Sequence, residues 1–243
     1  MLLRSGVLAA ARFAVTDRLG GVSAAPYDAL NLADHVGDAP PAVAENRERL
    51  AAALGVPSSQ VVYMSQVHGA DVAVVEASPA DGDAAPVADA MVTDRPGLAL
   101  AVLTADCVPV LLADGGGRVG VAHAGRKGVA RDVVGAVVAA LGRLGAEPAD
   151  LSALVGPAVC GACYEVPEAM RAEVGASVPA ARAETRDGTP SLDLPAAVES
   201  QLRRCGVATV DRVAPCTAET PALFSYRRDR ATGRFAGVVW APA

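Results

Sequence analysis

The sequence predicts an α+β fold built on mixed β-sheets. Segments typical of β-strands outnumber those typical of helices, and several neighbouring strand segments have no helix between them. Parallel neighbours require long crossover connections, so strands joined by short turns must pair in antiparallel fashion, at least in part. The 243 residues contain no segment with the composition of a linker. We therefore expect a single domain over residues 1–243.

The first expected elements are a helix and two short strands. Apolar residues recur at helical spacing over Ala42–Leu54; Asp38 or a neighbour can cap the start, and Gly55 can end the helix. Val61–Ser65 and Asp71–Glu76 are rich in β-branched residues, which favours strands.

The middle of the chain is dominated by apolar runs. Ser78–Pro86 is rich in Pro, Asp, Ala and Gly, which predicts a surface loop. Continuous apolar runs separated by turn residues are typical of strands that are buried on both faces. The runs are Leu98–Leu103, Val108–Leu112, Val119–His123 and Leu151–Val155. A helical pattern covers Gly128–Leu144. The last expected elements are helices near Pro167–Val174 and Pro195–Cys205 and strands near Val210–Ala214 and Ala236–Trp240.

Composition and charge restrict the functional class. Hydrophobic residues make up 52% and charged residues 20% of the chain, as in ordinary globular proteins. The net charge of −6 argues against nucleic acid or an anionic membrane surface as a partner. No run approaches the ~18 apolar residues of a membrane span. The N-terminal apolar stretch is too short for a secretory signal, so we expect a cytoplasmic protein whose five cysteines are reduced thiols.

Three residues stand in unusual local sequences: His68, Cys107 and His123. Two imidazoles and one thiolate can bind a zinc ion and leave its fourth tetrahedral position open, which is typical of a catalytic site. The residues are far apart in the sequence, so the fold must bring them together; otherwise they are a buried cysteine and two structural histidines. Asp106, beside the cysteine, could orient a ligand, act as an acid or base, or cap a turn.

A second cysteine group is formed by Cys160 and Cys163 in a Cys-X-X-Cys motif. This motif indicates either a structural metal or redox chemistry, to which Cys205 and Cys216 could contribute. Those two residues do not form the second close pair that a typical zinc motif requires.

Several short motifs are spread along nearly the whole chain, and it is their combination and their order that are informative. They are Gly20-Gly21-Val22-Ser23, Asn31-Leu32, His35-Val36-Gly37-Asp38, Glu45-Asn46-Arg47, Gln66-Val67-His68-Gly69, Ala105-Asp106-Cys107-Val108-Pro109, His123-Ala124-Gly125, Gly156-Pro157, Tyr164-Glu165-Val166, Cys216-Thr217, Phe224-Ser225-Tyr226-Arg227-Arg228 and Thr232-Gly233-Arg234. In this ordered set the chain resembles the YfiH-type family, also called the laccase-domain or multicopper polyphenol oxidase family.

This resemblance implies a four-layer α/β/β/α sandwich and zinc bound by His68, Cys107 and His123. It also implies phosphorolysis of adenosine, inosine and methylthioadenosine, with adenosine deamination as a further activity. One motif departs from the family, which usually has Gly-Trp-Arg-Gly where this chain has Gly125-Arg126-Lys127-Gly128. Lysine supplies a point charge where arginine supplies a two-pronged fork, so only the charge carries over at Lys127.

Purine nucleosides and phosphate are therefore the expected partners. Phosphorolysis requires an anion pocket beside the ribose, because cations stabilise charge that develops on a transferring oxyanion. The candidate substrate-binding residues are the cations Arg47, Lys127 and Arg227, the neutral donors Gln66 and Ser225, and Tyr164, which could stack on a base together with Tyr226.

Other chemistries remain open at the same residues. A four-copper oxidase needs many histidines and His-X-His pairs, whereas this chain has three histidines and no such pair; a single Cu²⁺ could still occupy the zinc site, giving a copper-dependent polyphenol oxidase. Alternatively, Cys107 could be the nucleophile of a thiol hydrolase or deamidase with His123 as its base. A zinc-stabilised interaction module is the non-enzymatic alternative.

Overall fold

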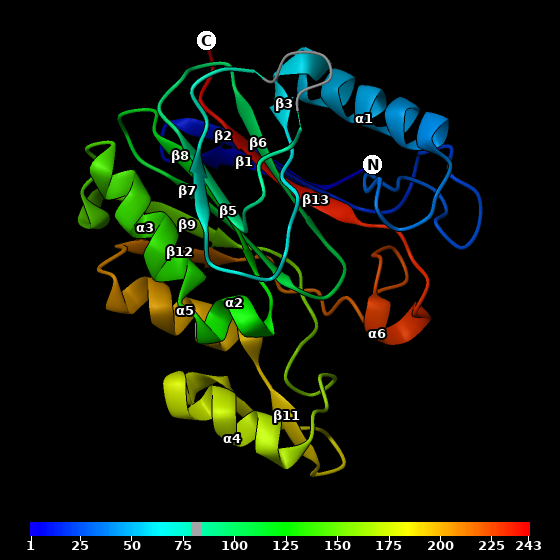
Figure 1. Cartoon of the computed structure of the whole chain (residues 1–243), viewed down its shortest axis with the longest axis vertical. Helices are drawn as coiled ribbons and strands as arrows, with labels where there is room; N and C mark the ends of the chain where they lie inside the picture. Colours follow the sequence, from blue (N-terminus) through cyan, green and yellow to red (C-terminus); the bar gives the residue numbers. More distant parts are fainter. Residues whose placement is uncertain (79–83) are drawn as a thin grey trace.

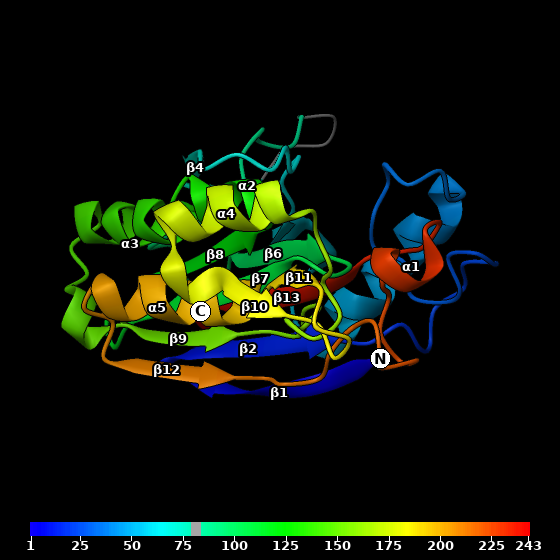
Figure 2. The same cartoon turned by 90° about the horizontal axis from the view of Figure 1, so that it is seen from below.

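The computed structural model describes residues 1–78 and 84–243 and places two β-sheets between helices. Figure 1 shows α1 (Pro40–Leu54) on one side of the strands and α3 (Val133–Arg143) and α5 (Leu194–Arg204) on the other. Figure 2 gives the same arrangement from below. The layers follow the order α/β/β/α, and the prediction of an α+β fold with mixed sheets is confirmed.

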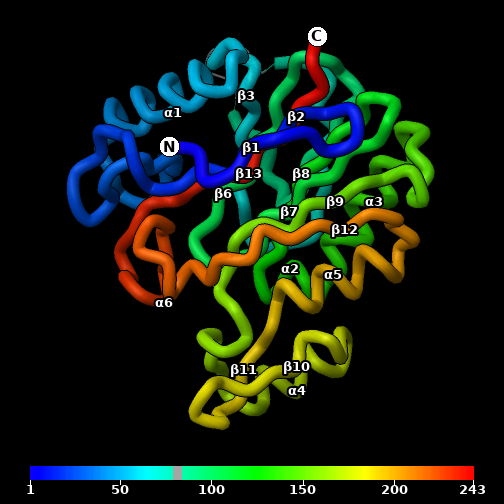
Figure 3. Tube along the Cα trace, turned by 180° about the vertical axis from the view of Figure 1, so that it is seen from behind, coloured from blue at the N-terminus to red at the C-terminus, as the bar shows by residue number. Residues whose placement is uncertain are grey.

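The five-stranded sheet joins the two ends of the chain. Its strand order is β1 (Leu2–Leu8), β2 (Ala11–Thr16), β13 (Phe235–Trp240), β6 (Ala99–Thr104) and β3 (Val61–Val62). Figure 3 shows the N-terminal strands in blue beside β13 in red. The β3–β6 pair is parallel, and the other pairs in this sheet are antiparallel.

The six-stranded sheet contains His123 in one of its strands, and Cys107 directly precedes another of them. Its strand order is β12 (Thr209–Arg212), β9 (Ser152–Val155), β7 (Val108–Ala113), β8 (Val119–Ala124), β5 (Ala90–Thr93) and β4 (Val72–Val74). The β9–β12 and β4–β5 pairs are parallel and the rest antiparallel. A separate hairpin pairs β10 (Arg182–Glu184) with β11 (Pro190–Leu192).

Burial on both faces explains why the central strands are continuous apolar runs. Side chains alternate across a strand, so Leu111 packs between the two sheets while Leu112 packs against α3 and α5. Likewise, Val239 lies between the sheets and Val238 faces α1. Each fully buried side chain of this kind stabilises the fold by about 1.5–3 kcal/mol.

The predicted long helix over Gly128–Leu144 is wrong in its continuity. The chain instead forms α2 (Arg126–Ala130) and then α3, with Asp132 between them in the left-handed region at φ 60°. The Asp132 carboxylate accepts from the N–H of Gly135 and so begins the second helix. Periodicity alone missed this break because Val129 and Val133 keep helical spacing across it.

The remaining elements agree with the sequence-based predictions at some positions and differ from them at others. Gly55 ends α1 at φ 71°, as predicted, but no side chain caps the start at Ala39, and Asp38 instead accepts from Ser23 and Asn31. Strands β1, β2 and β5 and the hairpin of β10 and β11 were not predicted. The other helices are α4 (Glu168–Ser177) and α6 (Tyr226–Asp229), and short 3₁₀ turns cover Ser58–Gln60, Pro148–Asp150 and Pro179–Ala181. Most of the predicted loop Ser78–Pro86 lies outside the described residues.

None of the helices in the described part of the chain combines the length and the apolar character needed to cross a membrane.

Candidate functional site

The fold brings His68, Cys107 and His123 together. Their ligating atoms all lie within 4.8 Å of one another, and Cys107 Sγ is 4.0 Å from His68 Nε2. The two imidazole rings meet edge to face with their centroids 4.8 Å apart. Tetrahedral zinc places a sulfur and a nitrogen ligand about 3.5 Å apart, given bonds of about 2.3 and 2.0 Å. The three ligand atoms would therefore have to move only slightly closer together to bind one metal ion.

One of the three residues lies on a strand of the six-stranded sheet, and the other two lie on connections between the two sheets. His123 is on β8 and is buried, with 4% of its surface exposed. Cys107 immediately precedes β7, in the turn that follows β6. His68 lies on the loop between β3 and β4 and has a left-handed backbone, with φ 60°.

A buried carboxylate that sequence reasoning missed, Asp89, organises both histidines. Its Oδ1 lies 2.8 Å from His123 Nδ1, which leaves His123 Nε2 as the nitrogen available to a metal. The backbone N–H groups of Val67, His68 and Gly69 all donate to the same carboxylate. A carboxylate behind a ligating histidine fixes the orientation of the ring. Asp89 fixes the loop that carries the other histidine as well.

The charge of Asp89 is maintained by these contacts. Burial raises the pKa of this carboxyl, but the hydrogen bonds from His123 and from the backbone of Gly69 and Val67 outweigh burial and lower it. The group is therefore an acceptor at neutral pH. The only signal in the sequence was an acidic residue directly before a short apolar run.

Cys107 and His123 stabilise each other in their charged forms. Burial opposes both charges, but the imidazolium of His123 outweighs burial at the thiol and lowers the pKa of Cys107 to about 6. In return, the thiolate and then Asp89 outweigh burial at the imidazole and raise the pKa of His123 to about 9. The thiolate form, which is the metal ligand and the nucleophile, is thus the stable form at pH 7.

Asp106 holds the turn before Cys107 in place. Its backbone is left-handed, at φ 98°, and its carboxylate accepts from Thr217 Oγ1 at 2.6 Å, Ser225 Oγ at 2.7 Å and the N–H of Arg227 at 2.6 Å. These three donors occupy both carboxylate oxygens. The arrangement suits a positioning group that secures an unfavourable backbone conformation next to a ligand.

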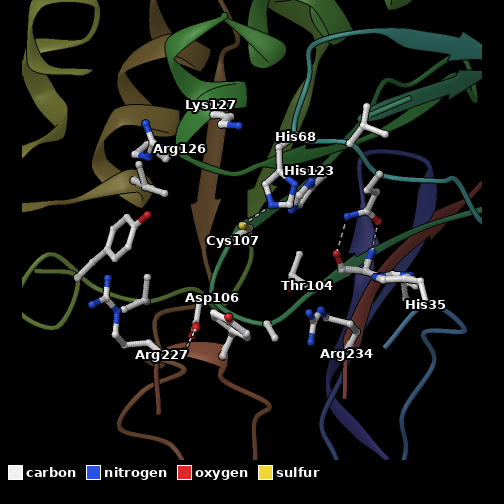
Figure 4. A pocket seen from close by; sticks show the side chains of 18 of the residues that line it. His35, His68, Thr104, Asp106, Cys107, His123, Arg126, Lys127, Arg227 and Arg234 are labelled. Atoms are coloured by element: carbon white, nitrogen blue, oxygen red, sulfur yellow. Dashed lines mark hydrogen bonds between the residues drawn. The ribbon is translucent and has the colours of Figure 1, made fainter. Parts of the chain in front are cut away.

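A cavity of about 570 Å³ opens beside the three ligands. Its walls include all three histidines of the chain and a group of cations on several elements. The cations are Arg126, Lys127, Arg227, Arg230 and Arg234. Figure 4 shows Arg227 and Arg234 across the space from His68, with Arg126 and Lys127 beside it. Negative ligands are thereby favoured in a protein whose net charge is −6.

Polar groups of the cavity remain available to a ligand. Thr104 lines it, is 1% exposed and has a hydroxyl with no hydrogen-bond partner among the described residues. Arg234 holds its guanidinium against the carbonyls of Thr232 and Gly233 through Nη1 alone. Arg230 and Thr104 were not predicted as site residues. Arg234 lay within a matched string but was not given a binding role, and Arg126 was noted only as a departure from the family motif.

The predicted substrate-binding residues have different placements. Lys127, Arg227, Tyr164 and Gln66 line the cavity. Gln66 pairs both polar atoms of its amide with the backbone of Leu103, and the Arg227 guanidinium lies 4.9 Å from the ring centre of Tyr164. One face of that ring is therefore already covered.

Arg47 and Ser225 are not among the cavity-lining residues. Arg47 packs over the Tyr63 ring at 4.2 Å and donates to the carbonyl of Leu32. Ser225 is fully buried; its hydroxyl donates to Asp106 and accepts from the N–H of Arg228, so it supports the site through that carboxylate and through the start of α6. Sequence spacing could not reveal either placement, because Arg47 lies on α1 and Ser225 caps α6, and the packing of both helices depends on contacts between distant segments.

Replacing Gly125 with Ala is expected to weaken metal binding without removing a ligand. A Cβ at this position would lie 3.0 Å from Cys107 Sγ and 3.0 Å from His68 Cδ2. Overpacking of this kind costs about 1–3 kcal/mol, which corresponds to roughly a 5- to 150-fold loss of metal affinity. Competition with a chromophoric chelator measures it. Gly142→Ala is the control, because a Cβ there meets nothing within 4 Å; equal affinities for the two variants would contradict the expectation.

The comparisons with known proteins concern the family and the fold of the chain. A family described as multi-copper polyphenol oxidoreductase laccase matches residues 12–242. A relative from Streptomyces coelicolor, named purine nucleoside phosphorylase, is 59% identical over 95% of each chain. The crystal structure of YlmD from Geobacillus stearothermophilus superposes with a TM-score of 0.89 at 34% identity, covering 97% of this chain and 93% of that one. A Neisseria meningitidis protein gives a TM-score of 0.87 at 36% identity, covering 100% and 99% of the two chains. The chain therefore belongs to the multi-copper polyphenol oxidoreductase laccase family, which is the YfiH-type family that its motifs resemble.

Proposed function

We propose that this protein is a zinc-dependent purine nucleoside phosphorylase that acts on adenosine, inosine and methylthioadenosine, with adenosine deamination as a second activity. Relatives named purine nucleoside phosphorylase, at 50% and 59% identity over more than nine-tenths of each chain, support the nucleoside and phosphate as substrates. The family's name refers to copper, but the proposal assigns zinc to His68, Cys107 and His123 because two imidazoles and one thiolate form a typical catalytic zinc site.

One observation carries the proposal: the three ligands and five cations face the same cavity. A volume of about 570 Å³ lies within the range of small-molecule sites. Phosphate needs the cations, while the nucleoside needs apolar and aromatic surface, which Val159, Leu194 and Tyr164 provide.

In phosphorolysis a phosphate oxygen attacks the ribose anomeric carbon while the bond from that carbon to the base breaks, giving ribose 1-phosphate and a base that takes up a proton. Arg227 and Arg234 line the cavity, and in this proposal they hold the phosphate and stabilise the charge that develops during the transfer. Zinc, when bound, supplies a Lewis acid with an open coordination position. Asp89 and Asp106 keep His123 and Cys107 oriented throughout.

The test is product analysis with inosine and with adenosine, each with and without phosphate, on protein whose metal content has been measured. Phosphate-dependent release of hypoxanthine together with ribose 1-phosphate is the expected result. Adenosine without phosphate should give inosine if deamination is a second activity. Protein that carries zinc yet gives no phosphate-dependent product from either nucleoside would contradict the proposal.

A second candidate is a thiol hydrolase, which the ordered contacts of Cys107, His123 and Asp89 favour. A thiolate, an imidazole and a carboxylate in sequence form the arrangement of cysteine hydrolases. This mechanism has no role for His68. A zinc ion that is present in wild type and lost in His68→Ala would count against it, because the same sulfur cannot serve as both metal ligand and nucleophile.

Cys107 in metal-free protein should be alkylated by iodoacetamide far faster at pH 7 than Cys163. The thiolate reacts, and it is the main form of Cys107 above its pKa of about 6, whereas burial raises the pKa of Cys163 to about 12. The rate at Cys107 should fall as the pH drops through 6. Mass spectrometry of the two peptides measures both rates; equal rates at pH 7 would contradict the charge pairing with His123.

A further inference from the structure

Outside the cavity, three sulfurs and a carboxylate gather in one place. The ligating atoms of Cys160, Cys163, Cys216 and Glu219 all lie within 4.8 Å of one another. Cys216 is buried, and Cys160 and Cys163 are half-buried. Cys205, which the sequence offered as a fourth thiol, is at the end of α5 and is not part of this cluster.

The backbone of the two loops arranges these side chains. The N–H groups of Cys163 and Tyr164 both donate to the carbonyl of Cys160 at 3.0 Å, which forms a tight turn and brings the two thiols of the motif together. A short parallel bridge joins Ala158 to Cys216, and Thr217 donates to the carbonyl of Ala158 at 3.1 Å. The third sulfur thus reaches the turn from 53 residues further along the chain than Cys163.

One contact is typical of a sulfur that carries negative charge. The N–H of Cys160 donates to Cys216 Sγ at 3.3 Å. Backbone donors to sulfur stabilise thiolates, and such contacts around metal ligands tune and orient them. Next to this group, the Arg186 guanidinium is paired with Glu219 at 2.5 Å through Oε1, so Oε2 remains for another partner.

A disulfide would use two of the three sulfurs and leave the third, with the carboxylate, unexplained. A cation uses all four groups at once. Zinc accepts sulfur and carboxylate ligands in tetrahedral geometry, and sites in which all four positions are protein ligands are structural. The positive Arg186 offsets part of the charge that three thiolates and a carboxylate leave around a divalent ion.

We propose that Cys160, Cys163, Cys216 and Glu219 form a second, structural zinc site. On binding, each of the three thiols releases a proton to solvent, the sulfurs and one carboxylate oxygen bond to the ion, and no group changes oxidation state. The site joins the loop after β9 to the loop after β12.

Both loops act on the turn before Cys107. Thr217, next to Cys216, donates its hydroxyl to Asp106, and the N–H of Val159, next to Cys160, donates to the carbonyl of Asp106 at 3.0 Å. The second ion would therefore brace Asp106 from outside the cavity. This inference does not depend on the proposed reaction.

Metal analysis of reduced protein purified without chelator tests the site. Wild type is expected to hold about two zinc ions per chain. Cys163→Ser and His68→Ala should each lower the content by about one ion. The matched control Cys205→Ser should leave it unchanged, because that thiol lies outside both clusters. The difference between wild type and Cys163→Ser reports on the second site whether or not the first is loaded.

Cobalt substitution keeps the test decisive if Cys163→Ser fails to fold. In His68→Ala, bound Co²⁺ should show intense near-ultraviolet charge-transfer bands from several thiolates, and chelation should lower the melting temperature. Cys163→Ser with the zinc content of wild type would overturn the proposal. A His68→Ala protein that binds no Co²⁺ would also overturn it. So would a purified protein with a Cys160–Cys163 disulfide whose reduction leaves the zinc content unchanged.

Discussion

Cys107→Ala is expected to lose the zinc held with His68 and His123 and to lose phosphorolysis with it. This residue supplies the only sulfur among the three ligands, and its thiolate is already favoured by His123. Removing one charge-stabilising group from an active site lowers kcat by about 10²–10³-fold, and loss of the ion should cost at least as much. Metal analysis and the inosine assay on the same preparation measure both effects. A Cys107→Ala protein that has lost the zinc of this site and still cleaves inosine would rule the mechanism out.

His68→Ala separates the phosphorylase from the thiol hydrolase. The metal site needs His68, whereas a Cys107–His123–Asp89 hydrolase does not. We expect His68→Ala to lose the zinc of this site and to fall in activity as far as Cys107→Ala. Cys205→Ala is the matched control for both variants, since it removes a thiol from the end of α5 and touches neither cluster. Full activity in His68→Ala would favour the hydrolase instead.

Asp89→Asn is expected to weaken zinc binding although Asp89 is not itself one of the three ligands. The amide supplies one acceptor where the carboxylate supplies two, and its NH₂ group would face backbone N–H donors of the loop 67–69. Loss of the carboxylate behind a ligating histidine typically costs 10–100-fold in metal affinity. Leaving buried donors without an acceptor costs a further ~1–3 kcal/mol of stability. Chelator competition and chemical denaturation measure the two effects separately.

Asp114→Asn provides the control for that variant. Asp114 is also buried, at 3% exposure, and its carboxylate accepts from the N–H groups of Gly116 and Arg118 and pairs with the Arg118 guanidinium. It lies outside the cavity-lining set. We expect this variant to lose stability and keep its zinc affinity. If Asp89→Asn behaves in the same way, the contact with His123 does not orient the ligand.

Local patterns predicted much of the fold for an identifiable reason. Strands such as β6, β7 and β8 are buried on both faces, so nearly every residue is apolar and the run is visible in the sequence. Strand β1 was missed because it is largely exposed at the edge of its sheet and lacks this pattern. Strand β5 has only four residues, too few for periodicity to be distinctive.

The site residues also differ in whether the sequence could identify them. His68, Cys107 and His123 could be named from the sequence because their side-chain chemistry and their motifs are specific, and the structure brings them within reach of one ion. Asp89 and Thr104 could not be named, since an aspartate or a threonine is common in any chain and acquires a role only from its neighbours. Arg47 shows the converse: its motif matched, but its guanidinium packs on Tyr63.

The sequence by itself determined which ligand atoms the protein possesses and which segments must be buried, because side-chain chemistry and apolar periodicity are properties of single residues and short runs. Only the tertiary structure decided that one carboxylate serves both histidines, that five cations share a cavity with the thiolate, and that Cys216 joins Cys160 and Cys163. The physical reason is that contacts between segments far apart in the chain depend on how the two sheets pack, and the local sequence does not record that packing.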